Sequence, residues 1–421
     1  MAQAIAIVNA NEFYVSCERV FDPGLLGRPV VVLSNNDGCI ISRSREARAL
    51  NLTMGAPLFK VQDIVEANDV AVFSSNYQLY GDLSLRLVEA FYEFTPDVEV
   101  YSIDEAFLGL ETHPDQSFRD YGLEIKAKVY QWTGVPCSLG ISQTKTLSKV
   151  AQRFTKKHAA AQGVLDLTDQ ADQTSVLEET PVEDVWGVGP AYGKLLAGAG
   201  ITTARQLRDA DRRWVRRRMI VVGARIVEEL RGISCLPLER CPQARKSVTC
   251  SRSFGVLVEF IEELREAVAV YTTKAAERRR RARLAAGVVR IFVSTNRFSA
   301  DPQYSNSVTF ELAYATDSTE ELLAWTRKAL ERIYRPGYRY KKAGVMLNHL
   351  TPADELTTRL FGDERFERSR RLMKAVDEIN RKFGRDTVRF DAVRPGGRWE
   401  TKCLRRSRRY TTCLNEVLRI A

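Results

Sequence analysis

The sequence lacks the cysteine and histidine patterns of a zinc-binding or disulfide-bonded protein. Its eight cysteines are scattered over 421 residues, and no two of them form a Cys-x-x-Cys pair. Reduced thiols, as in a cytosolic protein, are therefore expected. Only three histidines are present, which argues against a metal site built from imidazole groups.

Long hydrophobic runs are also missing. No apolar stretch approaches the roughly 18 residues that a helix needs to span a bilayer. The short apolar run that starts at Ala4 is not preceded by the basic segment of a secretory signal peptide. The sequence therefore predicts a cytoplasmic protein with no membrane partner.

Positive charge, in contrast, is abundant. Lysine and arginine outnumber aspartate and glutamate by 63 to 53, and the formal net charge is +10. This surplus favours a polyanionic partner, most simply nucleic acid, although a ribosome or an anionic membrane surface would select the same charge. At this length the chain is expected to form two to four domains.

The most informative stretch is Tyr101-Ser102-Ile103-Asp104-Glu105-Ala106-Phe107, in which two adjacent carboxylates lie within an apolar run. Neighbouring side chains of a strand point to opposite faces, so Asp104 and Glu105 can share one pocket only at a strand end or bend. Carboxylates in such a place suit Mg²⁺, which completes its octahedron with water and substrate phosphates. The alternative is an exposed turn with two solvated acids.

The first 170 residues alternate short strands with amphipathic helices, which predicts an α/β or α+β sheet domain. The strands are expected near 4–8, 30–33, 98–100 and 136–141, and the helices near 11–20, 44–50, 79–94 and 121–131. A further helix opens at 143–151, and its length is crowded with lysines, namely Lys145, Lys149, Lys156 and Lys157. A solvated basic face and a functional cluster both fit this pattern.

The stretch 185–203 has the pattern of a helix-hairpin-helix. Gly187 and Gly189 precede a helix that contains Lys194, and a second glycine turn follows at Gly200. Such a turn bares backbone N–H groups at a helix N-terminus, which forms a phosphate site that reads no base sequence.

Beyond a polar linker at 239–246, the pattern predicts a separate small α/β domain of about 100 residues. Its helices are expected near 260–284 and 320–333, and its strands near 288–293, 307–312 and 342–347. Its arginines suit backbone phosphates better than base edges, because no helix resembles a major-groove reader. After Pro352 the chain becomes polar and charged, and we expect a docking segment there rather than a domain.

Together these residues resemble the Y-family lesion-bypass DNA polymerases, and among them the UmuC branch. The resemblance extends along almost the whole chain. Its carriers are the strings at 13–18 (FYVSCE), 31–39 (VVLSNNDGC), 74–77 (SSNY), 101–107 (YSIDEAF), 143–147 (QTKTL), 250–255 (CSRSFG) and 409–412 (RYTT). The strings SNNDGC and CSRSFG look specific to the UmuC branch.

The resemblance implies an α+β multidomain fold, the right-hand architecture of these polymerases. It assigns the palm to 1–30 and 75–170, the fingers to 31–74, and the thumb with its helix-hairpin-helix to 171–238. The little finger would span 244–350, and a C-terminal partner-docking tail 351–421.

The resemblance also implies site residues. Two Mg²⁺ ions would be held by Asp104, Glu105 and the residue at position 9, and Tyr14 matches the steric gate that excludes a ribose 2′ hydroxyl. Nucleotide binding would fall to Phe13, Arg45, Arg48 and Lys156, where Arg45 replaces a tyrosine of many relatives. DNA binding is assigned to Gly187, Gly189, Lys194 and Arg252.

The implied substrates and partners are primer–template DNA, dNTPs, a cleaved UmuD-type dimer, a RecA-type recombinase filament and the sliding clamp. The implied setting is the SOS response to DNA damage, in the cytoplasm of a bacterium and close to the nucleoid. For the clamp, only Leu360 and Phe361 match the short motif, since Thr357 takes the place of its glutamine.

One departure from the family pattern concerns catalysis. The family has an aspartate four residues before the Phe-Tyr pair, and this chain has Asn9. An amide oxygen can still bind Mg²⁺ but brings no negative charge, so phosphoryl transfer is expected to slow by orders of magnitude. Either a competent enzyme carries one Asp→Asn change, or the chain is a DNA-binding scaffold that does not copy DNA. A nucleotidyl cyclase with a similar palm is disfavoured by the helix-hairpin-helix and the basic C-terminal domain.

Overall fold

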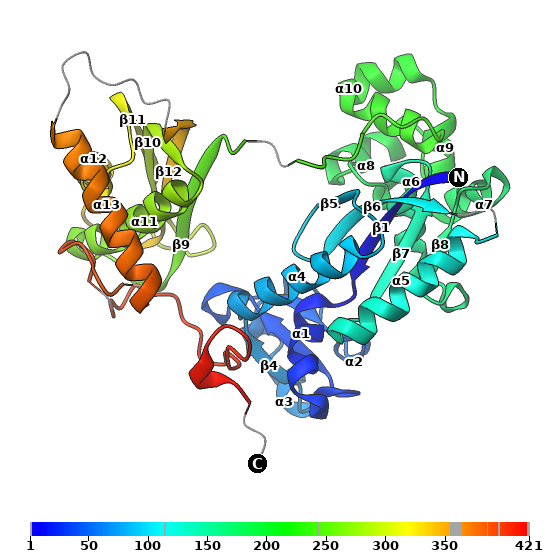
Figure 1. The fold of residues 1–421 in the computed structure, drawn as a ribbon, viewed down its shortest axis with the longest axis horizontal. Helices are drawn as coiled ribbons and strands as arrows, with labels where there is room; N and C mark the ends of the chain where they lie inside the picture. The colour runs from blue at the N-terminus through cyan, green and yellow to red at the C-terminus, as the bar shows by residue number, and fades with distance from the viewer. Residues whose placement is uncertain are drawn as a thin grey trace. The chain divides into compact units, whose positions relative to one another are not determined.

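The computed structural model describes residues 2–112, 115–241, 244–353, 364–384, 386–394 and 396–418 (Figure 1). The chain forms two compact units. The first unit comprises Met1–Ser34, Gly38–Pro242 and Arg405–Ala421, and the second comprises Asn35–Asp37 and Gln243–Leu404. None of the helices in the described part of the chain is long and apolar enough to cross a membrane.

A five-stranded sheet forms the centre of the first unit. Its order is β5-β6-β1-β7-β8, with β1 antiparallel to both β6 and β7, and β7 parallel to β8. The strands are β1 (Ala2–Ala10), β5 (Val98–Val100), β6 (Glu105–Thr112), β7 (Cys137–Ser142) and β8 (Val164–Asp166). The alternating strands and helices predicted for the first 170 residues are confirmed as a mixed α+β arrangement.

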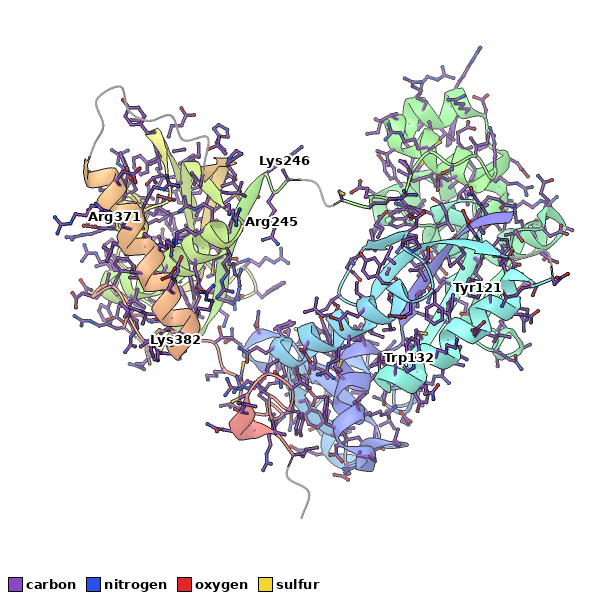
Figure 2. All side chains as sticks on the ribbon, viewed as in Figure 1. Tyr121, Trp132, Arg245, Lys246, Arg371 and Lys382 are labelled. Atoms are coloured by element: carbon purple, nitrogen blue, oxygen red, sulfur yellow. The ribbon has the colours of Figure 1, made fainter. Side chains whose placement is uncertain are left out.

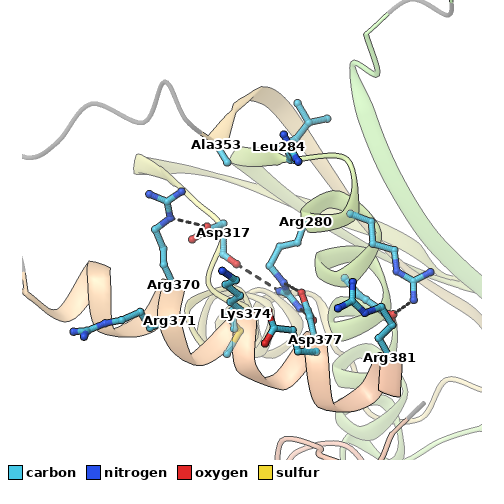
Figure 3. A pocket seen from close by; sticks show the side chains of 14 residues that line it. Arg280, Leu284, Asp317, Ala353, Arg370, Arg371, Lys374, Asp377 and Arg381 are labelled. Atoms are coloured by element: carbon cyan, nitrogen blue, oxygen red, sulfur yellow. Dashed lines mark hydrogen bonds and ion pairs between the residues drawn. The ribbon is translucent and has the colours of Figure 1, made fainter. Parts of the chain in front are cut away.

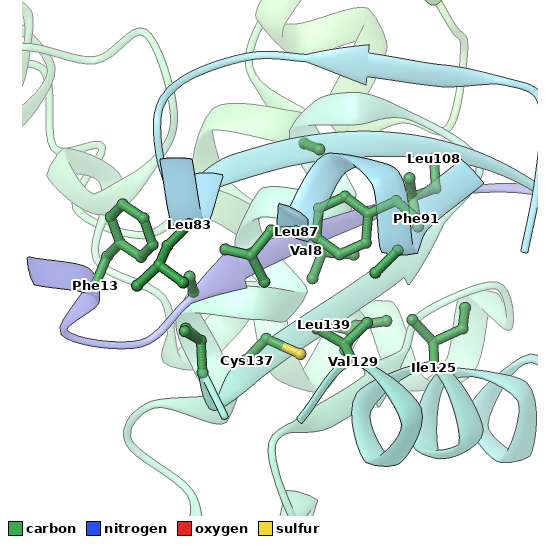
Figure 4. Packing of buried hydrophobic residues seen from close by; sticks show 14 of the residues in the cluster. Val8, Phe13, Leu83, Leu87, Phe91, Leu108, Ile125, Val129, Cys137 and Leu139 are labelled. Carbon is green, nitrogen blue, oxygen red and sulfur yellow. The ribbon is translucent and has the colours of Figure 1, made fainter. Parts of the chain in front are cut away.

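Helices cover both faces of this sheet. On one face, alternate residues of β1 such as Ala6 and Val8 join a buried cluster with α1 (Phe13–Phe21), α4 (Tyr77–Tyr92) and α5 (Phe118–Thr133), part of which Figure 4 shows. On the other face, α6 (Lys145–Thr155) lies against β7. Gly140 permits this close approach, because a Cβ atom there would lie 2.1 Å from the carbonyl oxygen of Ser148. The sheet therefore carries α6, with its lysines, on the face opposite α4 and α5.

A second, three-stranded sheet of order β3-β2-β4 has its own small core, which includes Val31, Leu33 and Ile40. Its elements are β2 (Val30–Leu33), β3 (Ile40–Arg43), α2 (Arg45–Ala49), α3 (Gln62–Ala67) and β4 (Ala71–Ser74). Short 3-10 turns occur at η1 (Pro23–Leu25), η2 (Asn35–Asp37), η3 (Leu58–Lys60), η4 (Ala159–Ala161), η5 (Val182–Asp184) and η7 (Leu414–Glu416).

Four helices complete the first unit and pack with α6 around a third core. They are α7 (Gln170–Glu179), α8 (Pro190–Ala197), α9 (Ala204–Asp209) and α10 (Arg212–Leu230). The carboxylate of Glu229 is fully buried on α10, and its two oxygens accept hydrogen bonds from the backbone N–H groups of Thr146, Cys235 and Leu236, at 3.0, 2.6 and 3.1 Å. This carboxylate therefore ties α10 to the first turn of α6.

Glu229→Leu is expected to lower the free energy of unfolding of the first unit by about 3 kcal/mol or more. The substitution leaves three backbone donors without their partner, and each unsatisfied buried donor costs about 1–3 kcal/mol. Urea unfolding measures the loss. Glu178→Gln, which removes the exposed ion pair with Arg205, is the matched control and should change stability by less than about 1 kcal/mol. Equal effects of the two substitutions would contradict this assignment.

The second unit is built on a four-stranded antiparallel sheet of order β11-β10-β12-β9. Its elements are β9 (Ser247–Val258), α11 (Ile261–Arg281), β10 (Leu284–Thr295), β11 (Ser305–Thr316), α12 (Thr319–Ile333) and β12 (Tyr340–Pro352). Buried residues of α11 and α12 pack with those of the strands into one core. The predicted helices near 260–284 and 320–333 are confirmed.

A 20-residue helix, α13 (Glu364–Phe383), lies within the region for which the sequence predicted only a polar docking segment. The helix was missed because its surface is charged and, of its described side chains, Met373 is the fully buried hydrophobic one. Arg371 and Lys382, labelled in Figure 2, are exposed on it. Met373, Val376 and Ile379 recur at helical spacing, so the apolar pattern could have identified this helix within the charged region.

Ion pairs attach α13 to α11 and to the turn before α12. The guanidinium of Arg280 donates two hydrogen bonds to the Asp377 carboxylate, at 2.7 and 2.8 Å, and Arg370 lies 3.5 Å from Asp317 (Figure 3). Beside them lies a pocket of about 920 Å³, most of whose lining residues are charged. Because the Arg280 side chain is largely buried, its bidentate pair with Asp377 fixes the register of the two helices.

Candidate active site

The carboxylate pair lies at the start of a strand, as the sequence predicted. β6 begins at Glu105, and Asp104 ends the bend that leads into it. The carbonyl oxygen of Glu105 accepts from the N–H groups of Tyr101 and Ser102, both at 3.0 Å, and the hydroxyl of Ser102 donates to the Asp104 carboxylate at 2.5 Å. This closed bend brings Asp104 and Glu105 close enough to the Lys156 ammonium for both to raise its pKa.

Asn9, on β1, lies directly opposite Glu105 in the sheet register and is 6% exposed. Its Nδ2 donates to Oε1 of Glu105 at 3.0 Å, and its Oδ1 accepts from Nζ of Lys156 at 2.7 Å. The orientation of the amide is fixed by its partners, because a carboxylate can only accept and an ammonium can only donate. Asn9 therefore connects the carboxylate of Glu105 to the ammonium of Lys156 and carries no charge itself.

Lysines of α6 and of the residues after it surround the carboxylates. Nζ of Lys149 lies 2.9 Å from Oε2 of Glu105 and 4.1 Å from the ring centre of Tyr101, and the rings of Trp186 and Phe107 lie within 6 Å of it. These rings hold the ammonium through cation–π contacts. The sequence pattern left open whether these lysines form a solvated face. Lys149 instead faces the carboxylates, and Lys145 is buried in an ion pair with Glu99.

Lys156, just beyond α6, has a lowered pKa. Burial of its ammonium is the main cause, and the charges of Arg153 and Arg48 add to it, whereas Glu105 and Asp104 oppose it. The nearby Arg48 shows that α2 faces the same site. A second cation beside Lys156 prepares the site for an anionic ligand.

Arg45 and Arg48 occupy the short helix α2, three residues apart, and both are exposed. They face Glu12, which directly precedes α1 and adopts a left-handed φ of 48°. Burial raises the pKa of Glu12, while the charges of Arg45, Arg19 and Arg48 lower it. The two predicted nucleotide-binding arginines are thus brought to one side of the site by α2.

Tyr14 lies in a stack of aromatic rings. Its ring is parallel to that of Tyr80, with centroids 4.6 Å apart, and perpendicular to that of Tyr77 at 6.0 Å. Burial, together with Tyr77 and Asp104, raises the pKa of Tyr14 to about 12. Phe13, its neighbour on α1, is buried in the core. The influence of Asp104 on Tyr14 places the ring beside the carboxylates.

The stretch predicted as a helix-hairpin-helix consists of the 3-10 turn η5, a glycine turn at 187–189, α8 and α9 in the first unit. Gly187 has a φ of +92°, and a Cβ atom there would lie 2.7 Å from Cδ1 of Ile226, so both the backbone conformation and the packing require glycine. Gly189 is the N-cap of α8 and makes no side-chain capping bond. Gly189 and Lys194 are exposed, which leaves the start of α8 accessible.

Arg252 lies on β9 of the second unit. Its strand neighbours Cys250 and Phe254 are buried in the core, so alternation places Arg252 on the face that α11 covers. The open face of the sheet carries Arg290 and Lys342 instead. Sequence reasoning missed these two, although the strand period of two could have identified them.

Two further residues were missed and one pair cannot be placed. Glu18 accepts from the hydroxyl of Tyr80, which stacks on Tyr14; Glu18 lies in the string 13–18 but was given no role, and no motif contained Tyr80. The predicted clamp-binding residues Leu360 and Phe361 lie outside the described residues. The described residues hold no group of three His, Cys, Asp or Glu side chains placed for a metal ion, because the third member beside Asp104 and Glu105 is the amide of Asn9.

Comparison with known proteins covers nearly the entire chain. Residues 8–153 match the impB/mucB/samB family, residues 245–360 match the C-terminal domain of that family, and residues 370–420 match a domain of unknown function. The chain is 41% identical to Protein UmuC of Salmonella typhimurium over 419 residues, which is 99% of each chain. It is 40% identical to Protein SamB of the same species over 414 residues, 97% of each chain.

More distant relatives are DNA polymerases by name. The chain is 30% identical to DNA polymerase IV of Desulfatibacillum aliphaticivorans over 388 residues, which is 90% of this chain and 94% of the relative. Among solved structures, a Y-family DNA polymerase chimera matches with a TM-score of 0.68 and 17% identity, covering 82% of this chain and 99% of the chimera. This structural likeness shows the fold.

Proposed function

The chain belongs to the impB/mucB/samB family and is a UmuC-like member of the Y-family DNA polymerases, and from this premise we propose that it is an error-prone translesion polymerase of the SOS response. Its enzyme class is that of a DNA-directed DNA polymerase, which transfers nucleotidyl groups. The observation that carries the proposal is the convergence of Asp104, Glu105 and Asn9 with Lys156 and the Tyr14 stack.

The donor set fits Mg²⁺. Asp104 and Glu105 offer two carboxylates and Asn9 an amide oxygen, and Mg²⁺ binds through one or two carboxylates while substrate phosphates and water fill the other positions. Two such ions, when bound, activate a primer hydroxyl and stabilise a leaving pyrophosphate. We assign Asp104, Glu105 and position 9 as the ligands.

The chain's own residues supply the remaining functions. Lys156 and Arg48 give positive charge for the triphosphate of an incoming dNTP, and Arg45 extends it. The ring of Tyr14, held by Tyr80, closes the space beside the sugar. These groups bind and orient the nucleotide without testing the pair of bases, and such a site tolerates damaged templates.

Primer–template DNA would be bound through its phosphates. In the first unit, Gly187 and Gly189 present backbone N–H groups before α8, and Lys194 adds an ammonium in the last turn of that helix. In the second unit, the open face of the sheet presents Arg290 and Lys342. These contacts read no base edges, so binding should weaken steeply as salt concentration rises.

Family membership also supports the proposed partners, namely a cleaved UmuD-type dimer, a RecA-type filament and a sliding clamp, in the cytoplasm near the nucleoid.

A second candidate function, a DNA-binding scaffold without catalysis, is favoured by Asn9 alone. The test is Mg²⁺-dependent incorporation of dNTPs on a primer–template, with and without the partner dimer. Binding without incorporation under any condition would support the scaffold.

Tyr14→Ala, made in an Asn9→Asp chain, is expected to raise ribonucleotide incorporation by roughly a hundredfold relative to deoxyribonucleotides. Removing the ring opens space for the 2′ hydroxyl, and that factor corresponds to ~2.7 kcal/mol of barrier. Single-nucleotide insertion of CTP and dCTP opposite a template guanine measures the ratio. Tyr14→Phe keeps the ring and serves as the control. An unchanged ratio of CTP to dCTP insertion in Tyr14→Ala would contradict the assignment of Tyr14 as the steric gate.

Lys149→Met, in the same chain, is expected to lower the turnover number by roughly 10- to 100-fold. Lys149 holds one oxygen of Glu105, and losing a group that orients a metal ligand typically costs this much. Pre-steady-state insertion measures the rate. Lys157→Met is the matched control, because Lys157 is exposed and pairs with Asp184 away from the site. A loss of similar size in the control would show that only general positive charge matters.

A further inference from the structure

The C-terminal segment 405–410 packs against β4, the start of α4 and the end of α1 in the first unit. The segment runs beside the edge strand β4, where the N–H of Ser74 donates to the carbonyl of Arg405 at 3.0 Å and the N–H of Arg405 donates to Oγ of Ser74 at 2.9 Å. A parallel bridge also joins Ser74 and Arg406. The segment thus adds a single β-bridge to the edge of the small sheet.

Side chains strengthen this attachment. Nδ2 of the buried Asn76 donates to the carbonyl of Ser407 at 3.2 Å, to its Oγ at 3.1 Å and to the carbonyl of Arg408 at 3.2 Å. The ring of Tyr410 stacks on that of Phe21 at 4.7 Å. Backbone, amide and aromatic contacts together hold the segment at one register.

Ser407 reaches a buried carboxylate. Glu18, on α1, is 2% exposed, and its Oε1 accepts from the hydroxyl of Ser407 at 3.0 Å and from the hydroxyl of Tyr80 at 2.6 Å. Burial raises the pKa of Glu18, and these two hydrogen bonds oppose that rise. Within the described residues, no cation forms an ion pair with Glu18, so the carboxylate depends on hydrogen bonds from these two hydroxyl groups.

Tyr80 connects this carboxylate to the proposed gate. Its ring is fully buried and stacks in parallel on Tyr14, while its hydroxyl is held by Glu18. The hydrogen bond to Glu18 restrains the Tyr80 ring, which is the surface against which Tyr14 stacks. The contacts form one connected series from Ser407 through Glu18 and Tyr80 to Tyr14.

We propose that the segment 405–410 is a positioning element for sugar selection, in which Ser407 acts through Glu18 and Tyr80 to hold the Tyr14 ring. This role rests on the proposed function of Tyr14 as a steric gate. It assigns a function to the end of the region that matches a domain of unknown function. Ser407, Glu18 and Tyr80 are positioning residues, since none of them touches the nucleotide.

The experiment uses the full chain with Asn9→Asp and its partner dimer, and measures insertion of dCTP and CTP opposite guanine. Ser407→Ala and Tyr80→Phe each remove one hydroxyl from Glu18, and each is expected to lower discrimination against CTP by about 5- to 20-fold. Insertion of dCTP should change less than threefold. A merely structural role would lower both rates equally and leave the ratio unchanged.

Two variants serve as controls. Glu18→Gln keeps an oxygen that can accept from both hydroxyl groups and should retain discrimination, whereas Glu18→Leu should lose it. Glu416→Gln weakens the pair with Arg409 in the same C-terminal region without touching Glu18, and should leave the ratio unchanged. If Glu18→Leu fails to fold, the Ser407→Ala and Tyr80→Phe pair still decides the result.

The outcomes separate this inference from the proposed function. Normal dCTP insertion with an unchanged ratio in both Ser407→Ala and Tyr80→Phe overturns the positioning role and leaves the polymerase intact. If the parent Asn9→Asp chain inserts no dCTP at all, the proposed function fails and the positioning role fails with it. A selective loss of discrimination in both variants supports the inference.

Discussion

Asn9→Asp is expected to raise template-directed dNTP incorporation by roughly a hundred- to ten-thousandfold, which corresponds to ~3–5 kcal/mol of activation free energy. In the present chain the carboxylates of Asp104 and Glu105 are balanced by the ammonium groups of Lys149 and Lys156. Aspartate at position 9 adds a negative charge at the point where Asn9 now bridges Glu105 and Lys156. The excess negative charge favours divalent cations.

The measurement is primer extension with Mg²⁺ and all four dNTPs, with both chains supplied with the partner dimer. Asn9→Ala is the control, since it removes the amide without adding a charge and should remain as slow as the present chain or slower. Extension by the Asn9→Asp variant alone would establish that the active site of the present chain lacks only the negative charge at position 9. If neither chain extends while both bind primer–template, the scaffold function is correct.

Asp104→Asn, made in the Asn9→Asp chain, is expected to reduce incorporation by a thousandfold or more, about 4 kcal/mol of barrier. Asparagine keeps the shape of the side chain and an oxygen that can accept from Ser102, so the bend before β6 should survive. The substitution removes the negative charge of Asp104, which we assign as a metal ligand together with Glu105. Affinity for primer–template should change little, because phosphate contacts elsewhere carry it.

Single-turnover insertion and a salt-dependent binding assay measure the two quantities for Asp104→Asn. Glu111→Gln is the matched control, because Glu111 lies at the far end of the same strand, exposed and paired with Gln3. It should leave insertion within about twofold. An active Asp104→Asn enzyme would place the catalytic carboxylates elsewhere.

Local sequence patterns predicted the elements that carry the candidate site. The bend at Asp104, the strand of Asn9 and the helix of Lys149 follow from the periodicity of apolar residues and from turn-forming residues within a few positions. Which way Lys149 points was not predictable from its helix alone. Its direction depends on Glu105, Tyr101 and Trp186, which come from other parts of the chain.

The remaining differences have the same origin. Arg252 was assigned to DNA from its motif, but the pairing of β9 with β12 decides which face of the sheet it occupies. The helix α13 has apolar residues at helical spacing, but its high charge drew attention away from them, and the ion pair Arg280–Asp377 that attaches it joins distant parts of the chain. Glu18 and Ser407 are 389 positions apart, and no local pattern joins them.

The docking of residues 405–410 has a consequence for the order in which the molecule is completed. The first unit is otherwise made of residues up to 242, and synthesis of the next 160 or so residues takes on the order of ten to thirty seconds at typical rates of translation. During that interval Glu18 lacks its hydrogen bond from Ser407, and β4 lacks its bridge to Arg406. The contacts around Tyr80 and Glu18 can therefore be completed only after residues 405–410 have been synthesised.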